Sequence, residues 1–324
     1  MKRLPAIVIL STLTLCSCLF AERKAKVVFL YGARSHKSGD HEFKAGSHLL
    51  ANHLNRQSAV GIKAIVHSGW PKDESILDDA AAVIIYSDAT KVIGNGWDKM
   101  EELMAQGVGC MLMHYAVHPT IEEGEKYFIP WIGGYFKNGK SVNPFWKATI
   151  EPNCDHETCG GVEPFHAIDE FYFNIEYSER MIPLGTATPT EQNLQRINNI
   201  WTQEGYEQKG VPQHLLWGIE RPDGGRGAGF TGGHYHKNWA LDDYRQLILN
   251  TIAWVAGKEV PESGVPTDPV TENELNENLD DYGPKTARIK LPDTKPVIEN
   301  PSEWWSPAAR EALRAERRKQ MKKK

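Results

Sequence analysis

Short apolar runs alternate with stretches of helical periodicity in the first third of the chain. An unbroken apolar run bounded by turn residues indicates a buried strand, whereas apolar residues that recur roughly every three or four positions indicate an amphipathic helix. The pattern predicts strands over 26–31, 62–66, 82–86 and 108–113, and helices over 42–54 and 97–106. Such strands, separated by helices, are typical of a parallel sheet with helices on both faces. We therefore expect an α/β fold.

The middle of the chain, from residue 120 to 230, is less regular. Strand-like pieces occur at 146–150, 171–173, 214–217 and 228–231, and the glycine-rich stretch 224–227 predicts a hairpin turn. A closing amphipathic helix is predicted over 242–256, with Gly257 at its end.

The amino terminus is typical of an export signal. Met1, Lys2 and Arg3 precede the apolar run 6–15, which is too short for a permanent membrane span. Two processing routes remain open. The stretch Leu15-Cys16-Ser17-Cys18 resembles a bacterial lipobox, which would make Cys18 a lipid anchor; alternatively, cleavage follows Ala21. We expect an exported protein, periplasmic or anchored as a lipoprotein, that contacts membrane only through Cys18.

Composition divides the chain into four predicted segments. Residues 1–21 are the signal, and 22–257 form one domain. Residues 258–302, rich in Pro, Glu and Asn, either wrap the domain or are mobile, and 303–324 form a basic helix or tail. The net charge of −5 gives no reason to expect a nucleic-acid partner.

Three cysteines follow the signal. Cys110 lies within an apolar run and is expected to be a buried thiol. Cys154 and Cys159 suit a short disulfide loop in an oxidising compartment. A metal knuckle that also uses His156 is the alternative.

Polar side chains follow the predicted strands at their carboxyl ends, the edge at which open α/β sheets bind ligands. His36 and His41 follow the first strand, Asp88 the third, and His114 the fourth, with His118 soon after. These residues are expected to share one edge of the sheet.

A second group of candidates lies later in the chain. His234 and His236 follow the piece 228–231, and an extended backbone would place both rings on one face. Asp169 and Glu170 supply adjacent carboxylates, and His166 lies near them. The other four histidines are expected to be structural: His48, His53, His67 and His214.

Two chemistries suit this set. A histidine paired with Glu170 or Asp169 could move protons as a general acid or base. Alternatively, His114, His234 and His236 could bind a divalent metal, zinc being the best match, which would polarise a carbonyl or activate water. The sequence contains no G-x-S-x-G elbow, no Walker loop and no G-x-G-x-x-G fingerprint after a strand.

Three segments resemble the ThuA-like, or trehalose-utilisation, family: 109–116, 168–172 and 226–234. The resemblance covers about residues 26 to 257 and implies the flavodoxin-like, parallel-sheet fold of class I glutamine amidotransferases. In those enzymes a cysteine nucleophile follows the strand at which this chain has His114, so thiolate-dependent glutamine hydrolysis should be absent. The resemblance implies sugar catabolism, with a disaccharide, a glycoside or a 3-keto-sugar as substrate.

The resulting hypothesis is an enzyme with His114, Glu170 and His234 as catalytic residues. Its expected substrate-binding residues are His41, Asp88, Asp169, Tyr172, Trp217 and Trp239. A non-catalytic carbohydrate-binding module on the same scaffold is the main alternative. A glutamine-amidotransferase-like hydrolase with another nucleophile is the third possibility, although no suitable Cys or Ser follows a predicted strand.

Overall fold

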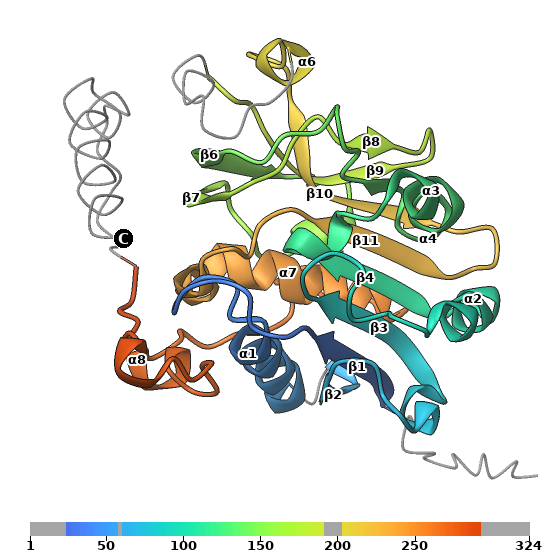
Figure 1. Cartoon of the computed structure of the whole chain (residues 1–324), viewed down its shortest axis with the longest axis horizontal. Coiled ribbons are helices and arrows are strands. Elements are labelled where there is room, and N and C mark those ends of the chain that lie inside the picture. Colours follow the sequence, from blue (N-terminus) through green and yellow to red (C-terminus); the bar gives the residue numbers. More distant parts are fainter. Residues whose placement is uncertain (1–23, 58–59, 191–202, 293–324) are drawn as a thin grey trace, which may run out of the picture.

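A computed structural model of the chain describes residues 24–57, 60–190 and 203–292. The predicted export signal, with Cys18, and the basic segment 303–324 lie outside the described residues. The central feature is a nine-stranded sheet of order β2-β1-β3-β4-β11-β10-β9-β6-β7 (Figure 1).

One half of this sheet is parallel, as the apolar runs predict. It contains β1 (Ala25–Tyr31), β2 (Ile62–Ser68), β3 (Ala80–Tyr86), β4 (Gly109–Met113) and β11 (Arg226–Phe230). In the register of this half, Phe29 pairs with Ile84 and Ile84 with Met111. The carboxyl ends of these five strands therefore meet at one edge.

The other half is antiparallel, which extends the predicted parallel sheet and agrees with the hairpin turn expected at 224–227. It contains β10 (Gln213–Glu220), β9 (Ile182–Ala187), β6 (Phe145–Pro152) and β7 (Phe165–Glu170). Adjacent strands such as β10 and β11 are joined by a hairpin turn, which reverses the chain without a helical crossover. Four successive antiparallel pairings separate β7 from β11, so β7 again points in the direction of β11.

One predicted strand is misplaced. Residues 171–173 are a buried aromatic loop directly after β7, with only an isolated bridge between Phe173 and Val142. Because aromatic burial produces the same apolar pattern in a loop as in a strand, the sequence could not separate the two.

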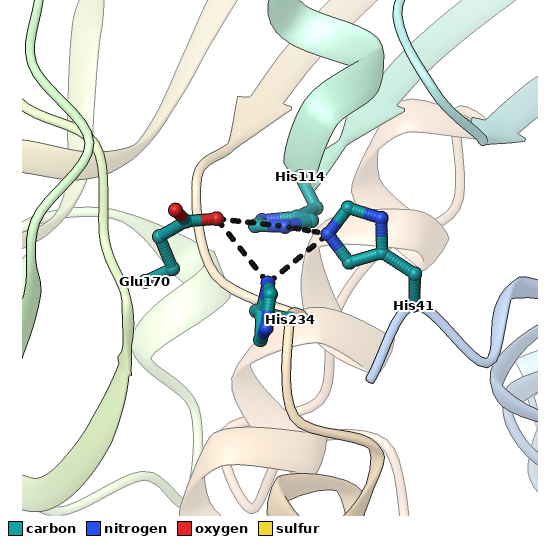
Figure 2. Close-up of side chains that lie close together, drawn as sticks. All are labelled: His41, His114, Glu170 and His234. Atoms are coloured by element: carbon teal, nitrogen blue, oxygen red, sulfur yellow. Dashed lines mark hydrogen bonds and ion pairs between the residues drawn. The ribbon is translucent and has the colours of Figure 1, made fainter. Parts of the chain in front are cut away.

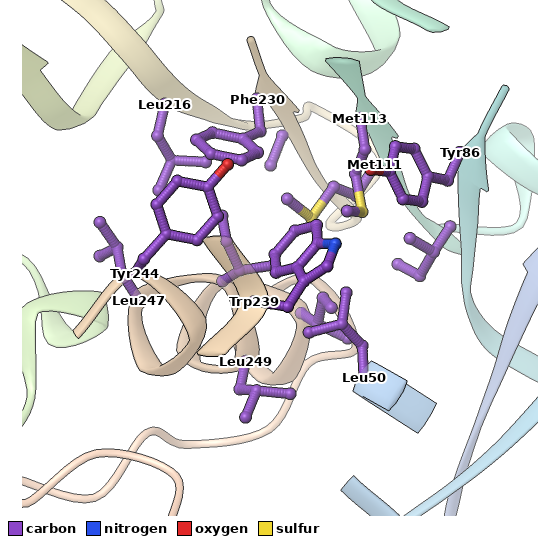
Figure 3. Packing of buried hydrophobic residues seen from close by; sticks show 14 of the residues in the cluster. Leu50, Tyr86, Met111, Met113, Leu216, Phe230, Trp239, Tyr244, Leu247 and Leu249 are labelled. Carbon is purple, nitrogen blue, oxygen red and sulfur yellow. The ribbon is translucent and has the colours of Figure 1, made fainter. Parts of the chain in front are cut away.

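Helices cover both faces of the sheet. The helices α1 (Phe43–Arg56) and α7 (Asp242–Val255) pack on one face, and α2 (Trp97–Ala105) and α4 (Ile129–Ile132) on the other. Alternation along β1 serves both cores, since Val27 and Phe29 face the first and Val28 and Leu30 the second. Figure 3 shows the first core, where Trp239 and Tyr244 pack between α7 and the sheet.

The remaining elements are short. They are η2 (Glu74–Leu77), η3 (His114–Val117), α3 (Ile121–Glu123), η4 (Gly124–Phe128), β5 (Gly134–Tyr135), η5 (Glu157–Cys159), β8 (Glu176–Tyr177), α6 (Gln203–Tyr206), η7 (His236–Ala240), α8 (Glu272–Leu275) and η8 (Gly283–Lys285). Within the described ranges, none of the helices has the length and apolarity that crossing a bilayer requires.

Residues 258–292, here called the C-terminal strap, pack against the domain. Val260, Val265, Val270, Leu275 and Ile289 are buried in the core that also contains α1 and α7. The described part of this segment therefore wraps the domain and is not a mobile linker.

The cysteines behave as expected for an oxidised chain. Cys154 and Cys159 form a disulfide, which confirms the loop and removes the thiolates that a metal knuckle would need. Cys110 is a free, buried thiol, and burial raises its pKa to about 12.

Candidate functional site

Four side chains from distant parts of the chain meet at the carboxyl edge of the sheet: His41, His114, Glu170 and His234 (Figure 2). His41 lies in the loop before α1, His114 follows β4, His234 follows β11, and Glu170 ends β7. One ligand atom from each lies within 4.8 Å of the other three. The predicted trio of His114, Glu170 and His234 is thus brought together, and His41, expected to bind substrate, joins it.

The closest contacts join ring nitrogens to one another and to one carboxylate oxygen. His41 Nε2 lies 2.9 Å from His114 Nε2 and 3.0 Å from His234 Nδ1. Glu170 Oε2 lies 3.2 Å from His234 Nδ1 and 3.6 Å from His114 Nε2. All four residues are at most 8% exposed.

His114 is held in an uncommon backbone conformation, with φ of 55°, immediately after β4. Its Nδ1 lies 2.9 Å from the Thr231 carbonyl oxygen, which can only accept a hydrogen bond. Burial, with His41 and His234 nearby, lowers the pKa of His114 well below its usual range. The ring is therefore neutral, with its proton on Nδ1 and a lone pair on Nε2 facing the cluster.

His41 is oriented by a carboxylate in the same way. Its Nδ1 lies 3.1 Å from Asp88 Oδ1, which also accepts a hydrogen bond from Ser35. Burial opposes ionisation of Asp88, but the hydrogen bonds from His41 and Ser35 outweigh it and lower the pKa of this carboxyl. In its neutral form, with the Nδ1 proton directed at Asp88, His41 also presents an Nε2 lone pair to the cluster.

His234 lies between two carboxylates. Its Nε2 is 3.4 Å from Asp40 Oδ2 and its Nδ1 is 3.2 Å from Glu170 Oε2. Burial disfavours protonation of His234, but hydrogen bonds to Asp40 and Glu170 outweigh it and raise its pKa to about 9. The fold therefore favours a second proton on His234 and disfavours one on His114.

Asp169, an expected substrate-binding residue, is instead a fully buried structural hub. Its carboxylate accepts backbone hydrogen bonds from Glu170, Gly233, His234 and Tyr235, and side-chain bonds from Asn238 and Tyr244. It thereby fixes the segment that carries His234 against the end of β7 that carries Glu170.

Tyr172 and Asn143 complete the immediate surroundings. The Tyr172 hydroxyl lies 3.3 Å from His114 Nε2, and burial raises its pKa well above the usual range, so it keeps its proton. Asn143 donates to Glu170 Oε1 at 3.1 Å. The half-buried ring of Phe145 packs 4.8 Å from that of His234, and Tyr235 lies beside it.

Three predicted site residues lie elsewhere. His236 begins η7, where the chain is no longer extended, and its Nε2 donates to the Leu275 carbonyl at 3.0 Å. Trp217 and Trp239 are fully buried in the two cores. These indoles pack against protein and cannot contact a sugar, because aromatic content alone does not distinguish core from cleft.

The other candidate histidines are not members of the four-residue cluster, although one of them lies beside it. The exposed ring of His36 lies 3.6 Å from that of His41, and these two with Asp88 form a second group of possible ligands. His118 contacts Asn138, His166 contacts Thr149 on β6, and His156 contacts Thr158 next to the disulfide.

Some site residues were missed. Ser35 and Asp40 lie in the same loop as the predicted histidines His36 and His41, and this position could have indicated that they belong to the site. Nothing in the sequence indicated Asn143 and Phe145, because the hydrophobic pattern of the antiparallel strands does not reveal their order in the sheet.

Comparison with known proteins agrees with this architecture. The family model described as ThuA, trehalose utilisation, matches residues 27–255. No curated protein matches the chain. A solved ThuA-like protein from Parabacteroides merdae is 15% identical, with a TM-score of 0.50 over 74% of this chain and 92% of its own. Another from Bacteroides uniformis is 14% identical, with a TM-score of 0.49 over 72% and 92% of the two chains.

At such low identity, the structural likeness concerns the fold alone. The family model carries more weight, because it spans most of the described residues, including all four members of the histidine–glutamate cluster. The chain belongs to the ThuA, or trehalose-utilisation, family.

Proposed function

We propose that this protein is a metal-dependent enzyme of sugar metabolism, with one divalent ion held by His41, His114, His234 and Glu170. Membership of the trehalose-utilisation family associates the chain with sugars. The proposed substrate is a 3-keto-sugar or a glycoside derived from one, and zinc is the favoured ion because three imidazoles and a carboxylate are ligands that it accepts.

The contact between His41 and His114 is the observation that carries the proposal. Their Nε2 atoms lie 2.9 Å apart, while the Nδ1 proton of each ring points at an acceptor, Asp88 or the Thr231 carbonyl. When both rings are neutral, two lone pairs at this distance repel each other, and a cation bound between them relieves the repulsion. An outward N–H bonded to a carboxylate or carbonyl is the usual arrangement of metal-binding histidines.

Proton chemistry alone explains less of the geometry. A proton on His234 satisfies its contacts with Asp40 and Glu170, in agreement with its raised pKa. The nitrogen that carries this proton, Nδ1, lies 3.0 Å from His41 Nε2, but the proton is shared with Glu170. The Tyr172 hydroxyl reaches His114 Nε2 only at 3.3 Å, so the two facing nitrogens gain only weak partners. A cation near all four donor atoms compensates them together, so we favour the metal over an acid–base cluster without one.

The protein's own groups suggest how a keto-sugar would react. A bound divalent ion supplies Lewis-acid polarisation of a sugar oxygen. Glu170 is the candidate base: its Oε1, which does not face the histidines, would take the proton from the carbon next to the carbonyl. The C–H electron pair would form the C=C bond of an enolate, and the π pair of the carbonyl would move onto its oxygen. Tyr172, which keeps its proton, can donate a hydrogen bond to an oxygen of the substrate. Asn143 fixes the Oε1 atom of Glu170.

Substrate contacts are proposed for the partly exposed rings next to the cluster. Phe145, Tyr235 and Tyr115 are each half-buried, and Phe145 and Tyr235 both pack against His234. Aromatic faces of this kind suit the apolar C–H surface of a sugar ring. They replace Trp217 and Trp239 in this role.

Export remains part of the proposal. The Cys154–Cys159 disulfide supports it, because disulfides persist in oxidising compartments such as the periplasm. Lipid anchoring at Cys18 and cleavage after Ala21 remain the two routes, which mass spectrometry of the mature protein would distinguish.

Elemental analysis of the purified mature protein tests the metal directly. We expect stoichiometric divalent metal in the wild type, loss of it in His114→Ala, and retention in His166→Ala, whose ring contacts only Thr149 among the bonds described. Turnover of 3-keto-disaccharides should follow the metal content. Wild-type protein without metal after zinc supplementation would refute the proposed centre, and sugar binding without turnover would favour the binding module.

A further inference from the structure

We infer that Glu42 is a positioning residue through which the C-terminal strap holds the His41 loop (residues 32–42) in place. This inference rests on the proposed metal site, since it concerns what fixes one of its ligands. The strap lies beyond residues 27–255, the range that the family model matches. The strap would therefore support, from outside the matched range, a metal centre whose ligands all lie within it.

The Glu42 side chain joins the loop to the strap. This residue is fully buried, and its two oxygens accept hydrogen bonds from two different segments. Oε1 accepts from the Gly39 backbone at 2.9 Å, and Oε2 accepts from the Asp280 backbone at 2.8 Å. Burying a carboxylate costs free energy, and the two hydrogen bonds of Glu42 offset that cost. An apolar side chain could be buried here without such a cost, but it would not join the two segments.

Two further contacts link the same segments. Arg34 lies over the Tyr282 ring at 4.6 Å and donates to the Asp281 carbonyl. Ser38 Oγ accepts from the Ala287 backbone at 2.9 Å. Both contacts involve exposed groups, whereas Glu42 is sealed from water, so Glu42 should contribute most to the joint.

The His41 loop in turn is paired with the segment that carries His234. The His41 backbone donates to the His234 carbonyl at 2.9 Å, and the His236 backbone donates to the Gly39 carbonyl at 3.0 Å. The strap also reaches this segment directly, through Leu275 and the ring of His236. Displacement of the strap would therefore make the position of His41 less fixed. The distance between His41 and His234 would then vary as well.

Cobalt(II) titration of the full chain tests this. Co²⁺ is a spectroscopic substitute for zinc, and its visible absorption depends on the number and type of its ligands. Glu42→Ala should weaken Co²⁺ binding by about 10-fold, the lower end of the effect of removing a group bonded directly to a metal ligand, because Glu42 acts through the loop backbone. It should also alter the absorption bands. Glu42→Gln, which keeps one acceptor oxygen, should recover part of both.

Glu157→Ala is the matched control. Glu157 Oε2 also accepts a strap amide, that of Val260 at 2.9 Å, but at the opposite end of the strap and outside the histidine cluster. This variant should bind Co²⁺ as the wild type does, with the same spectrum. Equal affinity and equal spectra in Glu42→Ala and the wild type would overturn the inference.

Amide hydrogen exchange of the metal-free protein separates the two proposals. If the wild type binds no Co²⁺, the proposed metal centre fails, and exchange alone decides the role of Glu42. Faster exchange over residues 34–43 in Glu42→Ala than in Glu157→Ala supports the joint. Unchanged exchange there overturns it.

Discussion

The carboxylate of Asp169 accepts the backbone N–H of His234 at 3.1 Å, and the same oxygen accepts the N–H of its own neighbour Glu170 at 2.9 Å. One buried side chain thus ties a possible ligand that follows β11 to another that ends β7. It does so through their backbone amides rather than through their side chains.

Asp169→Asn should lower both stability and metal content. An asparagine of the same shape presents an NH₂ group to donors such as Gly233 and Tyr244, and leaves buried groups unsatisfied. We expect a loss of about 3 kcal/mol or more in the free energy of unfolding, measured by urea denaturation. Asp243→Asn is the control, since Asp243 accepts one exposed amide, and an equal loss there would contradict this role for Asp169.

The backbone conformation of His114 should make a glycine variant more stable than an alanine variant at this position. At φ of 55° a β-carbon is strained, so His114→Gly should be more stable than His114→Ala by about 1 kcal/mol. Both variants remove the imidazole and leave similar cavities, so thermal denaturation of the metal-free proteins isolates the backbone effect. A more stable His114→Ala would mean that this turn relaxes in the variants.

Metal removal should destabilise the wild type. Chelator treatment would remove the proposed ion from between His41 and His114, whereas zinc at about 100 times its dissociation constant should stabilise the fold by about 2.7 kcal/mol. Differential scanning calorimetry with zinc and with chelator measures the difference. The shift should vanish in His114→Ala; a shift of equal size in that variant would place the bound metal elsewhere.

His53 should make stability fall in mild acid. It is buried between α1 and the strap, bonded to Thr267, and burial, aided by Arg245, lowers its pKa to about 4. The unfolded chain takes up a proton near pH 6.5 and the folded chain does not, so this stability is present above pH 6.5 and is lost as the pH falls toward 4. The loss should reach about 3 kcal/mol.

Unfolding experiments at pH 7.5 and 4.5 on the wild type and His53→Gln test this titration. Groups away from His53 titrate equally in both proteins, so the stability advantage of the wild type should shrink by about 2.5 kcal/mol at the lower pH. A constant difference between the two proteins would show that His53 does not titrate in this range.

Phe145 and Trp239 should affect different measurements. Phe145→Ala should raise KM for a keto-disaccharide by about 3–10-fold, the size of one lost aromatic contact, with little change in melting temperature. Trp239→Phe should lower the melting temperature and leave KM unchanged, because its indole is buried in the core. If the two variants behaved the other way round, the assignment of the sugar-facing rings would be wrong.

The sequence by itself determined the parallel half of the fold and the edge at which the site lies. Unbroken apolar runs marked β1, β3 and β4, and the residues after them, His41, Asp88 and His114, were placed correctly because parallel strands end at a common edge. The local hydrophobic pattern is enough for this prediction, because each strand and the loop that follows it are close together in the sequence.

Only the tertiary structure decided which of these groups meet. Glu170 reaches His114 because four antiparallel pairings return β7 to the same direction, and strand order is a long-range property. His236 turns away because η7 begins there, and Trp217 and Trp239 are buried because helices cover them. Local sequence limits the conformation of each segment, but the distance between remote side chains is fixed only when the segments pack together.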